Sequence, residues 1–332
     1  MKRIAHFFLA LILVVTTTLS FALDIEIATG DINGSYSRYI KEMAEVCNND
    51  AYTFKIRTTK GSPFNLDLIL ANEVPGGIAQ LDVGDLYRNT KDLSNIKILI
   101  PLFPEQVHFI TRAGITKKQL ASVKGIDIKI GGWTPGASEN PVRTVSDIVG
   151  MKIAAIGGSA YTARMMMHPN VGNLLITLDD TPNSNKEIVD GILSGIYDVG
   201  ILVTAYPAGV LDEYKATQNK LQLLPIDDAL MGRISKFYPM KDSLSYQLMR
   251  NSVNVTTVQV MSALLVPNYT KGPYADAFSY MRDCIQGNAE MMASTPRKHL
   301  AWSYIASRKG VVPSSWSIWE RSTTTLPPPK KK

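Results

Sequence analysis

A short apolar run that ends in a polar turn and resumes with helical spacing recurs along this chain. It occurs four times in the first two hundred residues, and a fifth such turn covers residues 198–206. Repetition of strand, turn and helix predicts an α/β fold whose turns lie at the carboxyl ends of parallel strands. Backbone N–H groups and positive helix-dipole ends gather there, which favours binding of a small polar molecule. The four turns cover residues 27–36, 58–65, 78–82 and 153–162.

The first 22 residues have the pattern of a signal peptide. Lys2 and Arg3 precede an apolar stretch at 7–15, and Ser20-Phe21-Ala22 supplies the small-x-small cleavage pattern. The apolar run is too short for a confident transmembrane span, which needs ~20 apolar residues. We therefore expect export to the periplasm after cleavage, with a retained N-terminal anchor as the alternative.

Composition predicts an ordinary globular protein with two domains. About 310 residues remain after the leader, at the usual ~100 to 200 residues per domain, and 45% of the chain is hydrophobic. The formal net charge is +6, and Lys330, Lys331 and Lys332 at the end of the chain supply three of these charges. The body of the chain is therefore nearly neutral. This balance excludes the dense basic surface of a nucleic-acid-binding protein. Residues 323–332 have the composition of a disordered tail.

Helical spacing places helix starts directly after the first turns. From Tyr36 onward, the apolar residues recur at a spacing that places them on one face of a helix, and Ser35 is expected to be its N-cap. Ser62 is expected to cap the second helix, with Pro63 at its first position. Asp82 either caps the third helix or faces a ligand.

Two long extended segments are expected to connect the domains. Residues 96–112 read as strand on both sides of a proline-containing interval, and residues 257–266 form the second candidate. Between them, a short helix near 145–148 leads into a strand and a Gly157-Gly158-Ser159 turn. Further helices are expected at 186–195, 274–293 and 297–309, and a further strand at 198–203.

The chain has two cysteines, Cys47 and Cys284, and both fall on predicted helices. In an oxidising exported setting, two thiols often pair, which would join the first helix to a C-terminal one. Two buried, unpaired thiols are the alternative.

This order of elements resembles a type II periplasmic solute-binding protein. More narrowly, the segments 29–36, 59–65, 80–82, 102–112, 145–150 and 197–207 look like those of TAXI-family receptors of tripartite ATP-independent periplasmic (TRAP) transporters. The resemblance implies a receptor, commonly monomeric, for a small carboxylated solute of the glutamate, glutamine or dicarboxylate class. It would deliver this solute to membrane permease subunits.

The domain boundaries follow from the same order. Domain 1 is expected to be discontinuous, at 23–112 plus 268–322, and domain 2 to span 113–267, with the ligand cleft between them. Residues 114–141 form an apparent insertion within domain 2, either a surface hairpin or a lid over the cleft.

A buried polar ligand needs hydrogen-bonding partners from both domains. Arg164 is the candidate cation for a ligand carboxylate, or else an ordinary surface arginine. Hinge closure around the ligand requires no catalytic group. The ligand-binding candidates are Asn33, Ser35, Tyr36, Ser62, Asn65 and Gln80 in the first domain, and Ser159, Tyr161, Thr162, Arg164, Thr204 and Tyr206 in the second.

Two other classes of function remain open on the sequence. An enzyme is disfavoured because no G-x-S-x-G or H-E-x-x-H motif occurs, and His108, His168 and His299 lack metal-ligand spacing. No metal or cofactor is expected. A binding-fold protein without transport, serving as a ligand sensor or an envelope-assembly component, would share the fold.

Overall fold

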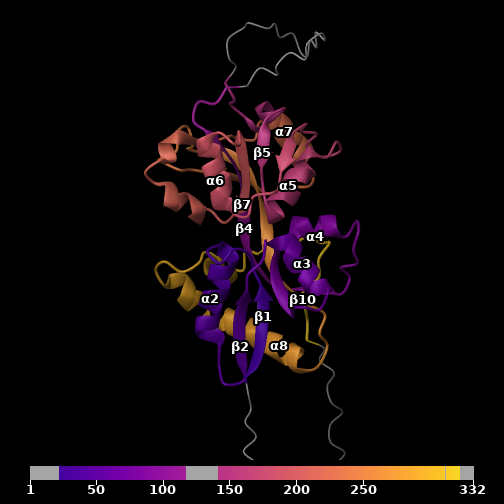
Figure 1. The fold of residues 1–332 in the computed structure, drawn as a ribbon. Coiled ribbons are helices and arrows are strands. Elements are labelled where there is room, and N and C mark those ends of the chain that lie inside the picture. Colours follow the sequence, from indigo (N-terminus) through magenta and orange to yellow (C-terminus); the bar gives the residue numbers. More distant parts are fainter. Residues whose placement is uncertain (1–21, 117–140, 311, 322–332) are drawn as a thin grey trace, which may run out of the picture.

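Two lobes share one continuous sheet in the computed structural model, which describes residues 22–116, 141–310 and 312–321. The strand order is β2-β1-β3-β10-β4-β7-β5-β6, with β8 paired to β4 and β9 paired to β10. The predicted α/β fold with the two lobes of a type II periplasmic binding protein is therefore confirmed (Figure 1). The strands are β1 (Leu23–Ala28), β2 (Tyr52–Arg57), β3 (Gly76–Gln80), β4 (Ile96–Arg112), β5 (Lys152–Ala154), β6 (Thr177–Asp179), β7 (Val199–Thr204), β8 (Leu221–Leu223), β9 (Lys241–Leu244) and β10 (Val255–Pro267).

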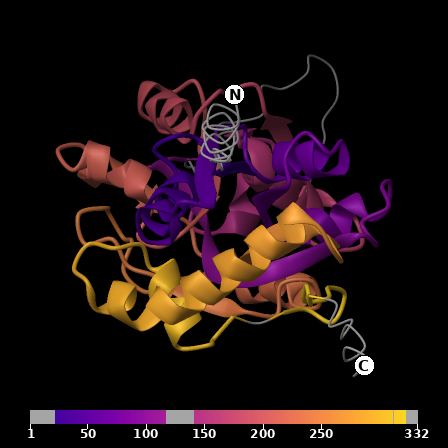
Figure 2. The same ribbon diagram turned by 90° about the horizontal axis from the view of Figure 1, so that it is seen from below.

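Helices cover both faces of the sheet in each lobe. The first lobe carries α2 (Ser35–Cys47), α3 (Ser62–Leu70), α4 (Leu81–Tyr87), α8 (Pro273–Ser294) and α9 (Ala301–Ala306). The second carries α5 (Gly157–Met167), α6 (Asn185–Ser194), α7 (Asp228–Ile234) and the 3₁₀ turns η1 (Val145–Ile148), η2 (Gly209–Tyr214) and η3 (Gln218–Lys220). Figure 2, seen from below, shows α8 running obliquely across the first lobe.

Each lobe has a separate apolar core on each face of its sheet. In the first lobe, α2, α8 and α9 pack on one face around Trp302 and Phe278, and α3 and α4 pack on the other around Leu66. In the second, α5 and α7 cover one face and α6 with η2 cover the other. These four cores bury the apolar stripes that the helical spacing predicts.

Strands β4 and β10 pass through both lobes, as predicted. In the first lobe β4 pairs with β10 antiparallel, with Glu105 opposite Val260; from Gln106 onward β4 also pairs with β7 of the second lobe. Pro101 and Pro104 lie within the strand and do not end it. The lobes are thus joined by two antiparallel strands (Figure 1), and Glu105 directly precedes the point where β4 begins to pair with β7.

Two predicted helix caps are wrong. Helix α2 begins at Ser35 with Gly34 as N-cap, and α3 begins at Ser62 with Gly61 as N-cap, neither with a side-chain cap bond. The Ser62 hydroxyl instead accepts a hydrogen bond from the Gln80 backbone N–H at 3.0 Å. Asp82 is not a cap either, because it is the second residue of α4, whose N-cap is Gln80.

The second helix of the C-terminal pair is shorter than predicted, covering Ala301–Ala306 rather than 297–309.

The exact domain boundaries stay a prediction. The leader, most of the 114–141 insertion and the 323–332 tail lie outside the described residues. No helix in the described part of the chain is long and apolar enough to span a membrane.

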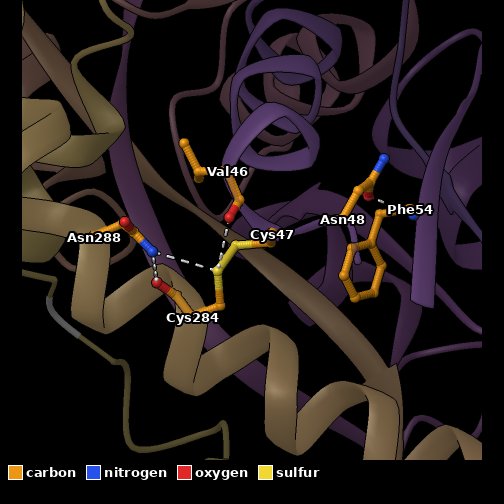
Figure 3. The surroundings of a disulfide bond; sticks show 6 residues. All are labelled: Val46, Cys47, Asn48, Phe54, Cys284 and Asn288. Carbon is orange, nitrogen blue, oxygen red and sulfur yellow. Dashed lines mark hydrogen bonds between the residues drawn. A yellow bond between two sulfur atoms is a disulfide. The ribbon is translucent and has the colours of Figure 1, made fainter. Parts of the chain in front are cut away.

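A disulfide joins Cys47, at the end of α2, to Cys284 in α8, with a sulfur–sulfur distance of 2.05 Å. Figure 3 shows the bridge between the two helices, with the Val46 carbonyl and Asn288 beside it. The Asn48 side chain next to it accepts a hydrogen bond from the Phe54 N–H at 2.9 Å, which fixes the start of β2. The bridge therefore ties together two helices that pack on the same face of the first lobe's sheet.

Candidate functional site

The two lobes meet where α5 packs against α3 and α4 (Figure 1). We call this contact the lobe junction. Its first-lobe residues are Lys60, Ser62, Gln80 and Asp82, and its second-lobe residues are Gly157, Gly158, Thr162 and Tyr238. The carboxyl-end turns of the first lobe therefore face the start of α5.

The lobe junction is closely packed around the first turn of α5. A Cβ atom on Gly158 would lie 1.9 Å from Gln80 Oε1 and 3.2 Å from Ser62 Oγ, so a larger residue would displace these side chains. Gly157 has a φ of +52°, and a Cβ there would lie 2.3 Å from the Lys60 carbonyl oxygen. Only glycine fits both the left-handed conformation and the space at Gly157.

Asp82 connects the lobes by hydrogen bonds. Its Oδ2 accepts from the Thr162 hydroxyl at 2.8 Å and from the Tyr238 hydroxyl at 3.3 Å, both in the second lobe. Its Oδ1 accepts from the Val83 N–H at 2.9 Å. Burial raises the pKa of Asp82 to about 6, and the hydrogen bond from Thr162 partly opposes that rise.

Glu105 lies buried beside the lobe junction, at the point where β4 crosses between the lobes. The Tyr36 hydroxyl donates to its Oε2 at 2.5 Å. Burial raises the pKa of Glu105 to about 8; hydrogen bonds from Tyr36 and Gln80 lower it, and the negative charge of Asp82 raises it. Burial also raises the pKa of Tyr36, and Glu105 adds to this rise.

Gln80 occupies the centre of this arrangement. Its side chain is 2% exposed, and its Oε1 has no hydrogen-bond partner while pointing at the start of α5. A buried carbonyl oxygen without a donor costs about 1–3 kcal/mol. Such an atom in a site of this kind suits a donor supplied by a bound molecule.

Four predicted ligand residues come together at the lobe junction, and the others do not. Tyr36, Ser62, Gln80 and Thr162 are all buried there. Ser159 is buried next to Gly158, but its hydroxyl accepts from the Val203 N–H at 2.8 Å. Tyr161 packs against Tyr87, with ring centroids 5.6 Å apart.

Several predicted residues have interactions within their own lobe. Asn65 is fully buried, and its amide donates to the carbonyls of Thr29 and Ile78, so it connects three turns. Arg164 is exposed and paired with Asp180. Tyr206 donates to the Ser245 carbonyl at 2.8 Å. Asn33 is exposed, while Ser35 and Thr204 are half-buried at the start of α2 and the end of β7.

Sequence reasoning missed Glu105 and Tyr238. Glu105 is the only acidic residue in the apolar run 96–112, and this isolated charge in a buried strand was the available signal. Tyr238 carries no comparable sequence signal, because it follows α7 in a loop whose position depends on the fold of the second lobe.

Other features of the described residues lie apart from the lobe junction. A surface pocket of about 500 Å³ lies on the first lobe, and none of the predicted ligand residues line it; it is lined by Arg88, Lys91, Asp92, Leu93, Ser94, Ile96, Lys97, Ser315 and Ser317. In the described ranges, no group of three or more His, Cys, Asp or Glu side chains is arranged to hold a metal ion.

Comparison with known proteins gives one family match and several similar folds. The sequence profile of the NMT1-like family matches residues 27–168. The glutamate-bound GluR0 ligand-binding core from Nostoc punctiforme is 13% identical, with a TM-score of 0.44 over 86% of this chain and 98% of that one. The substrate-binding protein of an amino acid ABC transporter is 10% identical, with a TM-score of 0.45 and the same coverage.

Regulatory domains are also among the similar structures. The effector-binding domain of QuiR in complex with shikimate is 9% identical, with a TM-score of 0.44 over 79% of this chain and 95% of that one. No curated protein matches this chain in sequence.

Proposed function

We propose that this chain is an extracytoplasmic receptor that binds a small polar solute between its two lobes and closes around it. The observation that carries the proposal is the lobe junction, where polar side chains from the second lobe bind Asp82 of the first and the unpartnered Gln80 Oε1 faces the start of α5. The two strands β4 and β10 join the lobes and supply the hinge. Solute contacts made from both lobes stabilise the closed form relative to the open one.

The receptor acts by binding alone in this proposal. Asp82, Thr162 and Tyr238 hold the lobes together on one side of the site, while Gln80 and Glu105 face the solute. When the lobes separate, these hydrogen bonds are exchanged for bonds to water, so closure has a small net free energy. A solute that adds contacts in both lobes is then sufficient to shift the equilibrium.

The sequence resemblance supports the finer part of the proposal. We propose a periplasmic location after cleavage of residues 1–22, and delivery of the solute to TRAP-type permease subunits. Glutamate, glutamine and related carboxylated solutes are the first compounds to test. The partner is tested by co-purification with permease subunits encoded near this gene, in the presence and absence of solute.

A thermal-shift screen of the exported, purified chain tests the binding function. A solute at about 100 times its Kd adds about 2.7 kcal/mol to the free energy of unfolding. We expect a dose-dependent rise in Tm with one chemical class of small polar solute, confirmed by calorimetry at one site per chain. Folded protein, freed of co-purified solute by partial unfolding and refolding, that responds to no compound contradicts the proposal.

A further inference from the structure

We propose that the solute carries a protonated amine or guanidine, and that this group binds against the Glu105 carboxylate and the Gln80 amide oxygen. The inference rests on the proposed receptor function and names the chemical class of its solute. It follows from the charges and the unpartnered acceptor at the lobe junction.

The buried Glu105 and the half-buried Asp82 lie at this site, and neither is ion-paired with a side chain in the described part of the chain. Glu105 is 3% exposed, and Asp82 is close enough to influence it electrostatically. Among residues 22–116, 141–310 and 312–321, neither carboxylate takes part in an ion pair. Acidic residues are rarely buried unless they are paired, so this arrangement lacks a positive partner.

The unpartnered acceptor is independent of the two acids. Gln80 Oε1 is buried, and no donor in the described part of the chain reaches it. An ammonium or guanidinium group has several N–H donors, which lets it satisfy an amide oxygen and a carboxylate together. Gln80 is close enough to Glu105 to help lower the pKa of that carboxyl, so the two side chains are neighbours.

A solute whose only charged groups are carboxylates fits this part of the site poorly. The cation expected for it, Arg164, is exposed and bound to Asp180. A solute carboxylate here adds a negative charge near the Asp82 carboxylate and opposes ionisation of Glu105, and neither residue offers it a positive partner. Amino acids and simple amines meet the requirement, whereas dicarboxylates without nitrogen do not.

Binding of a cation also predicts proton release. Because the pKa of Glu105 is raised to about 8, the empty closed form carries a proton on this side chain at pH 7. A bound ammonium group favours the ionised carboxylate, so the proton passes from Glu105 to the buffer. Calorimetry in two buffers of different ionisation enthalpy measures this release, and we expect about one proton per solute.

Matched compounds separate the chemical classes. Glutamate and glutarate differ only by the α-ammonium group, and 1,4-diaminobutane and succinate share a four-carbon skeleton. We expect binding by one or both ammonium compounds and at least tenfold weaker binding by the corresponding dicarboxylate. Binding of the dicarboxylates alone overturns the amine inference and leaves the receptor function intact. Failure of all four, together with the wider solute screen, overturns the receptor function as well.

Substitution at Glu105 tests the position of the amine. Glu105→Gln keeps the size of the side chain and an acceptor for Tyr36, so we expect a folded protein with at least tenfold weaker amine binding and no proton release. Glu42→Gln is the matched control, because Glu42 is a buried acid that binds His299 and Trp302 away from the lobe junction. Unchanged amine affinity in folded Glu105→Gln overturns the inference.

Discussion

The Asp82 carboxylate in the first lobe accepts a 2.8 Å hydrogen bond from the Thr162 hydroxyl in the second. This bond crosses between segments that are eighty residues apart in the sequence. Tyr238 adds a second donor from the same lobe to the same oxygen. The contact makes the closed arrangement of the lobes testable without knowledge of the solute.

Removing the Thr162 hydroxyl should favour the open form. Thr162→Val keeps the shape of the side chain but deletes the donor to Asp82, and hydrogen bonds to charged groups contribute about 1.5–3 kcal/mol. We expect a larger radius of gyration by small-angle X-ray scattering in the absence of solute.

Thr181→Val is the control for this measurement. Thr181 donates to Asp179 at 2.6 Å within the second lobe, so its loss removes the same type of bond without affecting the lobe junction. Equal radii for both variants and the wild type would show that the Thr162–Asp82 bond does not hold the lobes together.

The buried acids predict weaker stability at higher pH. Folding raises the pKa of Asp82 to about 6 and of Glu105 to about 8, so the folded state binds more protons than the unfolded state above pH 4. The contribution of these two acids to the free energy of unfolding therefore falls as pH rises from about 4 to 8, and it sets the net fall between about pH 6.5 and 8, where His108 and His299 are neutral in both states. Urea unfolding at several pH values should show this fall in the wild type and a smaller one in Glu105→Gln. Identical slopes would argue against a raised pKa at Glu105.

His108 has the opposite dependence on pH. Its Nε2 is bound to the Tyr246 hydroxyl at 2.9 Å, and that hydroxyl accepts from the Ala208 N–H. Burial lowers the pKa of His108 to about 4, so its contribution to stability is complete above pH 6.5 and is lost as pH falls towards 4. NMR of the His108 ring should show no titration between pH 5.5 and 8. A midpoint near 6.5 would contradict the buried, neutral ring.

The Cys47–Cys284 bridge should contribute substantially to stability. It joins positions 237 residues apart, and closing so long a loop in the unfolded chain is worth about 5.5 kcal/mol in the chain-entropy model. We expect the double variant Cys47→Ala/Cys284→Ala to lose stability by that amount, and the reduced wild type to match it. The denatured, unreduced protein should show no reactive thiol; two thiols per chain would contradict the bridge.

The sequence was sufficient for the elements and their order but insufficient for the contacts of the turns. Apolar spacing predicted α2, α6, α8 and the crossing strands to within a few residues, because this spacing directly reflects burial in a core. The Ser35 and Ser62 caps were wrong because Gly34 and Gly61 occupy the N-cap positions and each serine is the first residue of its helix.

The candidate site was only partly predictable for a similar reason. A polar residue at a strand end gives the same sequence pattern whether its side chain faces a ligand or bonds to the backbone around it. Asn65 bonds to the turns around it, whereas the side-chain oxygen of Gln80, from the next turn, has no partner. Which of these occurs depends on how the two lobes pack, and that information is spread over the whole chain.

The most direct test of the central claim uses Gly158, at the start of α5. Gly158→Ala places a methyl group 1.9 Å from the present position of Gln80 Oε1, while Gly232→Ala in α7 meets no atom within 4 Å. Calorimetry with the best solute from the screen should give at least tenfold weaker binding for Gly158→Ala and wild-type affinity for Gly232→Ala. If Gly158→Ala binds the solute as tightly as the wild type, the solute does not bind at the lobe junction.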